Sequence, residues 1–213
     1  EILLLDEPLS NLEMEARVAM RRELRRLQEE IGLIIIYVTH DQVEALSLAD
    51  RIAVMHCGKI LQLEETTQIC NRPDHLFVAD FLGSPPMNLV SGEFQMLDGI
   101  VHFVHDSLKI KAGEALSACA GAPSGIHAMG IRPDAIRLVP STSAPIAGRI
   151  MLTELRGPEA VVTVAVGSLN LKVLTQPDTI YREGDSVGLS MDPSAILFYS
   201  KETSRRINLA PLR

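Results

Sequence analysis

Residues 2–8 read Ile-Leu-Leu-Leu-Asp-Glu-Pro, a short apolar run that ends in two adjacent carboxylates. A continuous apolar run of this length is typical of a buried strand in a parallel sheet. Such a strand would place Asp6 and Glu7 at the carboxyl edge of the sheet, where folds of this kind bind ligands. Because successive strand residues point to opposite faces, one carboxylate could hold Mg²⁺ while the other polarises an attacking water. The alternative is that two acids simply end a strand at a solvated edge.

Helical and strand patterns alternate through the segment that follows. Apolar residues recur at three- and four-residue steps over residues 12–31, which predicts an amphipathic helix that ends at Gly32. Residues 34–38 read as a second buried strand. Asp41 and Glu44 then have the spacing of a capping box at the start of another helix. This order predicts an α/β fold with a parallel sheet.

The polar face of the first predicted helix is rich in arginine. Glutamates alternate there with Arg17, Arg21, Arg22, Arg25 and Arg26. This pattern predicts a solvated helix face with ion pairs between residues four apart.

The second part of the chain has a different composition. A hairpin with Gly58 at its turn is predicted over residues 52–63. Pro85 and Pro86 then break any helix, so we place a domain boundary after residue 83. Residues 84–213 hold short β-branched runs separated by Gly, Pro, Asp and Asn, which predicts an all-β domain.

The predicted β domain contains an internal repeat. Residues 130–136 read Gly-Ile-Arg-Pro-Asp-Ala-Ile, and residues 190–196 read Ser-Met-Asp-Pro-Ser-Ala-Ile, 60 positions later. Two similar β units packed together would close a small barrel.

Charge and cysteine content exclude several classes of protein. The net charge is −7, and all of the excess negative charge lies in residues 1–83. Without a basic face, nucleic acid is not an expected partner. The three cysteines are widely spaced and favour reduced, cytosolic thiols over a disulfide framework or a zinc site. No apolar run approaches the ~20 residues that span a bilayer.

A histidine ends the second predicted strand. Residues 37–41 read Tyr-Val-Thr-His-Asp, and parallel strands end at a common edge, so His40 should lie beside Glu7. An imidazole there could bond the terminal phosphate of a nucleotide. A single histidine after an apolar strand is usually structural. Its pairing with two carboxylates favours the functional interpretation.

These motifs resemble those of the ATP-binding subunits of ABC importers, specifically the maltose-type group that imports sugars. Residues 3–8 match the family's Walker B motif, residues 9–13 resemble its D-loop, and His40 corresponds to its switch histidine. The similarity covers nearly the whole chain. It implies part of a P-loop NTPase domain of the ABC type, with a parallel sheet, followed by an all-β tandem barrel of OB-like units. The corresponding domains are residues 1–83 and 84–213.

The resemblance implies roles for the three residues at the predicted sheet edge. Asp6 would hold Mg²⁺, Glu7 would act as the base or orient the attacking water, and His40 would contact the γ-phosphate of ATP. ATP and Mg²⁺ are therefore the expected cofactors.

The resemblance also implies that Ser10, Asn11 and Glu13 contribute to nucleotide binding from a D-loop that crosses a homodimer interface. The family usually has aspartate at the last of these positions. Glu13 is one methylene longer, so coupling between the two ATP sites could differ here.

The phosphate-binding part of the family's site is absent from this sequence. No Gly-x-x-x-x-Gly-Lys-[Ser/Thr] loop occurs in the 213 residues, nor do the signature motif and the glutamine loop. We therefore expect the chain to begin partway through its ATPase domain and to be inactive alone.

The function that the resemblance implies is ATP-driven import of a solute. A sugar or glycerol phosphate is favoured, and polyamine, iron or sulfate remain alternatives. The expected partners are membrane permease subunits and, indirectly, a periplasmic or extracellular solute-binding protein. The expected location is the cytoplasmic face of the cell membrane, as a peripheral subunit.

An alternative function concerns the β domain by itself. OB-like folds bind small ligands or proteins without catalysis, so residues 84–213 could act in dimerisation and regulation. A small-anion sensor that uses Arg132, Arg137 and Arg149 is another form of this hypothesis.

Overall fold

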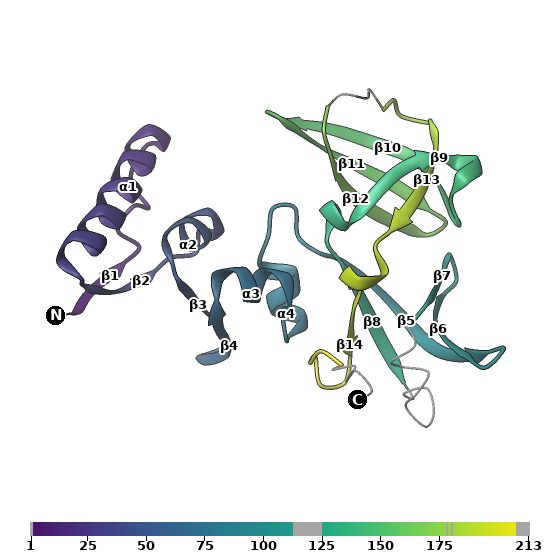
Figure 1. The fold of residues 1–213 in the computed structure, drawn as a ribbon, viewed down its shortest axis with the longest axis horizontal. Helices are drawn as coiled ribbons and strands as arrows, with labels where there is room; N and C mark the ends of the chain where they lie inside the picture. The colour runs from purple at the N-terminus through teal and green to yellow at the C-terminus, as the bar shows by residue number, and fades with distance from the viewer. Residues whose placement is uncertain (1, 113–124, 178, 180, 208–213) are drawn as a thin grey trace. The chain divides into compact units, whose positions relative to one another are not determined.

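The computed structural model describes residues 2–112, 125–177, 179 and 181–207, and the chain divides into two compact units (Figure 1). The first unit is Glu1–Asn71 and the second is Arg72–Arg213. The sequence placed the domain boundary twelve positions later, after residue 83. None of the helices in the described parts of the chain combines the length and apolar composition that a membrane-spanning helix needs.

The first unit opens on a parallel pair of strands. β1 (Ile2–Asp6) pairs with β2 (Ile34–Val38), and α1 (Met14–Ile31) connects them. α1 ends at Gly32, whose φ of 69° is a left-handed conformation that glycine adopts readily. The predicted strand–helix–strand order is therefore present.

The apolar side chains of this strand pair are not buried as the sequence predicted. Leu4 is 70% exposed and Ile34 is 62% exposed. The physical reason is that, among the described residues, the sheet holds only these two strands, so further strands do not cover its edges.

The rest of the first unit is a helix, a hairpin and a second short helix. Their bounds are α2 (Gln42–Leu48), β3 (Arg51–His56), β4 (Lys59–Glu65) and α3 (Thr66–Asn71). Cys57 and Gly58 form the hairpin turn, with φ values of 47° and 74°. Two successive left-handed residues are typical of the tight turn that suits the twist of a hairpin. The predicted hairpin is confirmed.

The second unit holds α4 (Leu76–Phe81) and two five-stranded antiparallel sheets (Figure 1). The first sheet has the order β14-β8-β5-β6-β7 and the second has the order β12-β11-β10-β13-β9. The strand bounds are β5 (Asn88–Leu97), β6 (Ile100–His105), β7 (Leu108–Lys111), β8 (Ile126–Ile131), β9 (Ile136–Pro140), β10 (Ile146–Arg156), β11 (Glu159–Val166), β12 (Leu169–Thr175), β13 (Ser186–Met191) and β14 (Leu197–Ser200). The described residues between 84 and 207 are thus built mainly on strands, as predicted.

The two sheets have the same number of strands, and the chain crosses twice from one sheet to the other. β8 runs through a 3-10 turn (Pro133–Ala135) into β9, which leaves the sheet of β8 and pairs with β13. β13 runs through the equivalent turn (Pro193–Ala195) into β14, which pairs with β8. These two turns are the repeated proline segments of the sequence. The repeat therefore corresponds to two β units that exchange a strand.

One hydrophobic core serves both sheets. Its fully buried members include Phe103 and Met129 from the first sheet and Val162 and Leu189 from the second. The ring of Phe94 packs edge-on against that of Phe103, with 5.7 Å between ring centroids. Since the two sheets bury their inner faces against each other, the second unit is stable as a two-layer β domain.

α4 belongs with the second unit because it covers a smaller core formed with β8 and β14. This cluster contains Ala79, Met87, Ala128 and Tyr199. The Tyr199 hydroxyl donates to the carbonyl oxygen of Pro73 at 3.0 Å. The contacts explain why the division between the units precedes α4 rather than following residue 83.

Candidate active site

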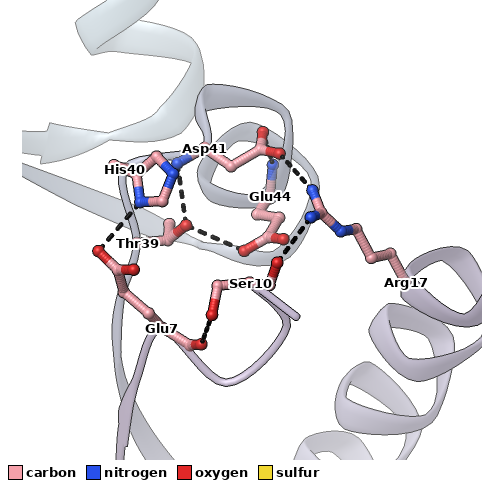
Figure 2. Close-up of a pocket in the computed structure, with 7 residues that line it drawn as sticks. All are labelled: Glu7, Ser10, Arg17, Thr39, His40, Asp41 and Glu44. Atoms are coloured by element: carbon pink, nitrogen blue, oxygen red, sulfur yellow. Dashed lines mark hydrogen bonds and ion pairs between the residues drawn. The ribbon is translucent and has the colours of Figure 1, made fainter. Parts of the chain in front are cut away.

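A small pocket lies at the carboxyl ends of β1 and β2 (Figure 2). The side chains come from the loop after β1, the first turn of α1 and the segment that joins β2 to α2. The lining residues are Glu7, Ser10, Arg17, Thr39, His40, Asp41 and Glu44. The parallel crossover therefore brings together residues that lie about thirty positions apart in the sequence.

Glu7 holds a backbone conformation that is uncommon for a residue with a side chain. Its φ is 44°, and its backbone N–H donates to the carbonyl oxygen of Val38 at 2.8 Å. The Ser10 hydroxyl donates to the carbonyl oxygen of Glu7 at 3.0 Å. Conformations of this kind cost roughly 1–3 kcal/mol and persist where surrounding contacts hold them. The turn after β1 is therefore fixed from both sides.

His40 lies directly against Glu7, as the sequence predicted. The His40 Nδ1 and Glu7 Oε1 atoms are 3.0 Å apart, and the two side chains are 75% and 46% exposed. The hydrogen bond to the Glu7 carboxylate, and then its negative charge, raise the pKa of His40 above its ordinary value. Because Nδ1 is the ring nitrogen against the Glu7 carboxylate (Figure 2), Nε2 is the one that can meet a ligand.

Because the pKa of His40 is raised, the stability that its pairing with Glu7 contributes depends on pH. A raised pKa means that the folded chain binds the His40 proton more tightly than the unfolded chain does. The contribution of the pair to stability is thus fully present below the unfolded pKa of about 6.5. It is lost as the pH rises through the raised pKa of the folded state.

We expect Glu7→Gln to lower the pKa of His40 toward about 6.5, because the amide removes both the carboxylate acceptor and its charge. NMR titration of the His40 ring protons in this chain measures the change. The matched control is Glu64→Gln, which removes an exposed acid from β4. An unchanged His40 pKa in Glu7→Gln would contradict the contact between the two side chains.

A buried carboxylate supports the loop that carries His40. Glu44 is only 1% exposed and accepts hydrogen bonds from the Tyr37 hydroxyl at 2.8 Å and the Thr39 hydroxyl at 2.9 Å. The Thr39 hydroxyl oxygen also accepts from the backbone N–H of Asp41 at 3.0 Å. Burial, and then the bond to Glu44, raise the pKa of the Tyr37 phenol. The two donors satisfy a carboxylate that would otherwise be costly to bury.

The predicted capping box is present only in part. The Asp41 side chain accepts from the backbone N–H groups of Val43 and Glu44, so it caps α2 as expected. Glu44 does not bond back to the Asp41 N–H, because that N–H already donates to Thr39. The prediction of a reciprocal box was therefore wrong.

Three of the predicted site residues do not line the pocket. Asp6 ends β1 opposite Val38 and is exposed. Asn11 is also exposed, and Glu13 is the N-cap residue of α1 but makes no side-chain capping bond. Across the described residues, no three His, Cys, Asp or Glu side chains gather closely enough to hold a metal ion. Mg²⁺ at nucleotide sites commonly has one or two carboxylate ligands beside phosphate oxygens, and the oxygen donor of Asp6 suits that mode.

Three residues that line the pocket, Arg17, Thr39 and Glu44, were not predicted to belong to the site. Arg17 was assigned to a solvated arginine-rich face. That prediction does hold for Arg25 and Arg26, which pair with glutamates four residues ahead. For the loop after β2, the available signal was a polar Thr39 directly before the histidine and an acidic Glu44 four positions after it.

Comparison with known proteins gives one family model and several relatives. A model described as a TOBE domain matches residues 129–198. An ABC transporter ATP-binding protein of Escherichia coli, YcjV, described as uncharacterized, is 35% identical over 95% of this chain and 56% of its own length. The trehalose/maltose import ATP-binding protein MalK of Thermococcus litoralis is 34% identical over 97% of this chain and 57% of its own length. The sn-glycerol-3-phosphate import ATP-binding protein UgpC of Ralstonia nicotianae shows the same identity and coverage.

The chain thus spans a little more than half the length of the curated relatives it matches. Among solved structures, the molybdate-binding protein ModG aligns with a TM-score of 0.41 and 12% identity, over 52% of this chain and 94% of its own. That likeness is too low to bear on the function of the site.

Proposed function

Because this chain belongs to the family of ABC transporter ATP-binding subunits, we propose that it forms part of an ATP-hydrolysing importer subunit. In this proposal the chain carries the carboxylates and the histidine of the ATP site. The observation that carries the proposal is the contact between Glu7 and His40, 3.0 Å apart at the carboxyl edge of a parallel strand pair.

Each polar residue at this edge has a role in the proposed reaction. The Glu7 carboxylate accepts a proton from the attacking water, or orients that water toward the γ-phosphate. The Nε2 edge of His40 donates to a γ-phosphate oxygen, while Glu7 fixes the ring through Nδ1. Asp6 would hold Mg²⁺, and that ion would supply positive charge to offset the charge on the phosphates.

Ser10, Asn11 and Glu13 are proposed to contribute to nucleotide binding at a homodimer interface. Asn11 and Glu13 are exposed, which suits residues that meet a second copy. Ser10 lines the pocket and also donates to the carbonyl oxygen of Glu7, so it links that interface to the carboxylate.

The proposed partners and solute follow from the relatives. MalK is named for trehalose and maltose import and UgpC for sn-glycerol-3-phosphate import, which favours a sugar or glycerol phosphate here. Membrane permease subunits and, indirectly, a solute-binding protein complete the proposed transporter. The ATPase would lie in the cytoplasm against the inner face of the membrane.

A regulatory or dimerising role of the second unit is the second candidate function. The unit has its own core, and residues 129–198 within it match a TOBE domain. The anion-sensor form of this hypothesis has less support, because Arg132 already donates to the carbonyl oxygen of Leu82. Hydrogen bonds from Ser194, and then the charge of Arg137, lower the pKa of Asp192. Of the three candidate arginines, Arg132 thus has a hydrogen-bond partner within the chain.

The proposed function predicts a difference between this chain and the full-length protein that contains it. The chain has no phosphate-binding loop, so we expect calorimetric titration with Mg-ATP to give no micromolar binding. The full-length protein should bind and hydrolyse ATP. Micromolar binding by the isolated chain, or no hydrolysis by the full-length protein, would contradict the proposal.

A further inference from the structure

Arg17 joins the two segments that carry the candidate catalytic residues (Figure 2). From α1, its Nε donates to the carbonyl oxygen of Leu12 and its Nη2 donates to the carbonyl oxygen of Ser10, both at 2.9 Å. Its Nη1 lies 3.5 Å from the Asp41 Oδ2 atom. One guanidinium group therefore contacts both the loop after β1 and Asp41, the N-cap residue of α2.

The other arginines of α1 with described ion pairs contact groups outside the pocket. Arg25 pairs with Glu29 and Asp50 and donates to the carbonyl oxygen of Leu48. Arg26 pairs with Glu23 and Glu30, which lie on the same helix. Arg17 instead contacts the two loops that carry Glu7 and His40, through Ser10 and Asp41, and its side chain is only 27% exposed. A planar guanidinium has five donors in a fixed arrangement, so it can serve three acceptors at once, whereas a lysine ammonium cannot match that geometry.

Each of the two loops that Arg17 contacts also carries a candidate catalytic side chain. Ser10 bonds the carbonyl oxygen of Glu7 through its backbone N–H at 3.2 Å and through its hydroxyl at 3.0 Å. Asp41 follows His40 directly, and its own N–H is held by Thr39. A displacement of either loop would therefore change the 3.0 Å distance between Glu7 and His40.

We propose that Arg17 is a positioning residue that holds the Glu7 carboxylate and the His40 imidazole in register. This inference rests on the proposed ATPase function. The ion pair with Asp41 is long and partly exposed, so it contributes little to stability. Arg17 would act by keeping the catalytic side chains in place, since a misplacement of about 1 Å can slow a reaction by up to ~10²-fold.

The test is steady-state ATP hydrolysis by the full-length protein with Arg17→Gln and Arg17→Lys. The control is Arg22→Gln, an exposed position on the same helix. We expect Arg17→Gln to lower kcat per bound nucleotide by roughly tenfold or more, with KM changed by less than about twofold. Arg17→Lys should recover only part of the loss, and Arg22→Gln should match the unmodified protein.

Glu7→Gln in the same assay separates this inference from the proposed function. If Glu7→Gln loses hydrolysis but Arg17→Gln keeps its kcat, the positioning role is wrong and the proposed function stands. If Glu7→Gln also keeps its activity, the proposed function fails first. A variant that binds less nucleotide, but turns over each bound nucleotide normally, would show that Arg17 only stabilises the fold and would overturn the inference.

Discussion

Glu7→Gln in the full-length protein is expected to slow ATP hydrolysis by about 10²-fold or more while ATP binding survives. The amide has nearly the shape of the carboxylate but cannot accept a proton from water. It also loses the charge that holds the His40 ring at 3.0 Å. Phosphate release under saturating Mg-ATP measures the rate, and equilibrium titration measures the binding.

The control for this prediction is an acid of the same unit that lies outside the pocket. Glu15 is exposed near the start of α1, so Glu15→Gln should keep the full rate. Near-normal turnover by Glu7→Gln would assign the chemistry to another group, and His40→Ala would be the next variant to measure.

Removal of residues 72–83 from the second unit is expected to lower its free energy of unfolding by at least about 3 kcal/mol. Tyr199 is fully buried, and without this segment its hydroxyl would lose the Pro73 carbonyl acceptor. The small core would also lose Ala79, and Arg206 would lose its ion pair with Asp74 at 2.7 Å. Urea unfolding of fragments 72–213 and 84–213 measures the difference.

Two point variants in fragment 72–213 separate the causes. Tyr199→Phe keeps the packing but removes one hydrogen bond, so it should cost only about 1 kcal/mol. Asp80→Ala changes an exposed residue of α4 and should stay within about 0.5 kcal/mol of the unmodified fragment. Equal stability of fragments 72–213 and 84–213 would mean that α4 is not part of the second unit.

The elements of the first unit were predictable because their signals are local. The apolar periodicity of residues 12–31, the glycine at 32 and the turn at Gly58 each act over a few residues. The exchange of β9 and β14 between sheets was not predictable, because those pairings join strands about 50 and about 70 residues apart in the sequence. The sequence showed the repeat but carried no local signal for which sheet each strand joins.

In the candidate site, too, some contacts were predictable from the sequence and others were not. Glu7 and His40 were expected to meet because parallel strands end at one edge, and topology alone brings them together. Arg17 carried no such signal, since it lies in an arginine-rich helix in which Arg25 and Arg26 pair with glutamates four residues ahead. Its role depends on where two loops end in space, which periodicity does not describe.

A structure of the full-length Glu7→Gln protein with Mg-ATP bound would test the proposed ATP site most directly. We expect the γ-phosphate within about 2.6–3.2 Å of His40 Nε2, with Asp6 at the Mg²⁺ ion and residue 7 facing the position of the attacking water. A nucleotide bound with its phosphates remote from both His40 and residue 7 would contradict the assignment of these residues to ATP hydrolysis.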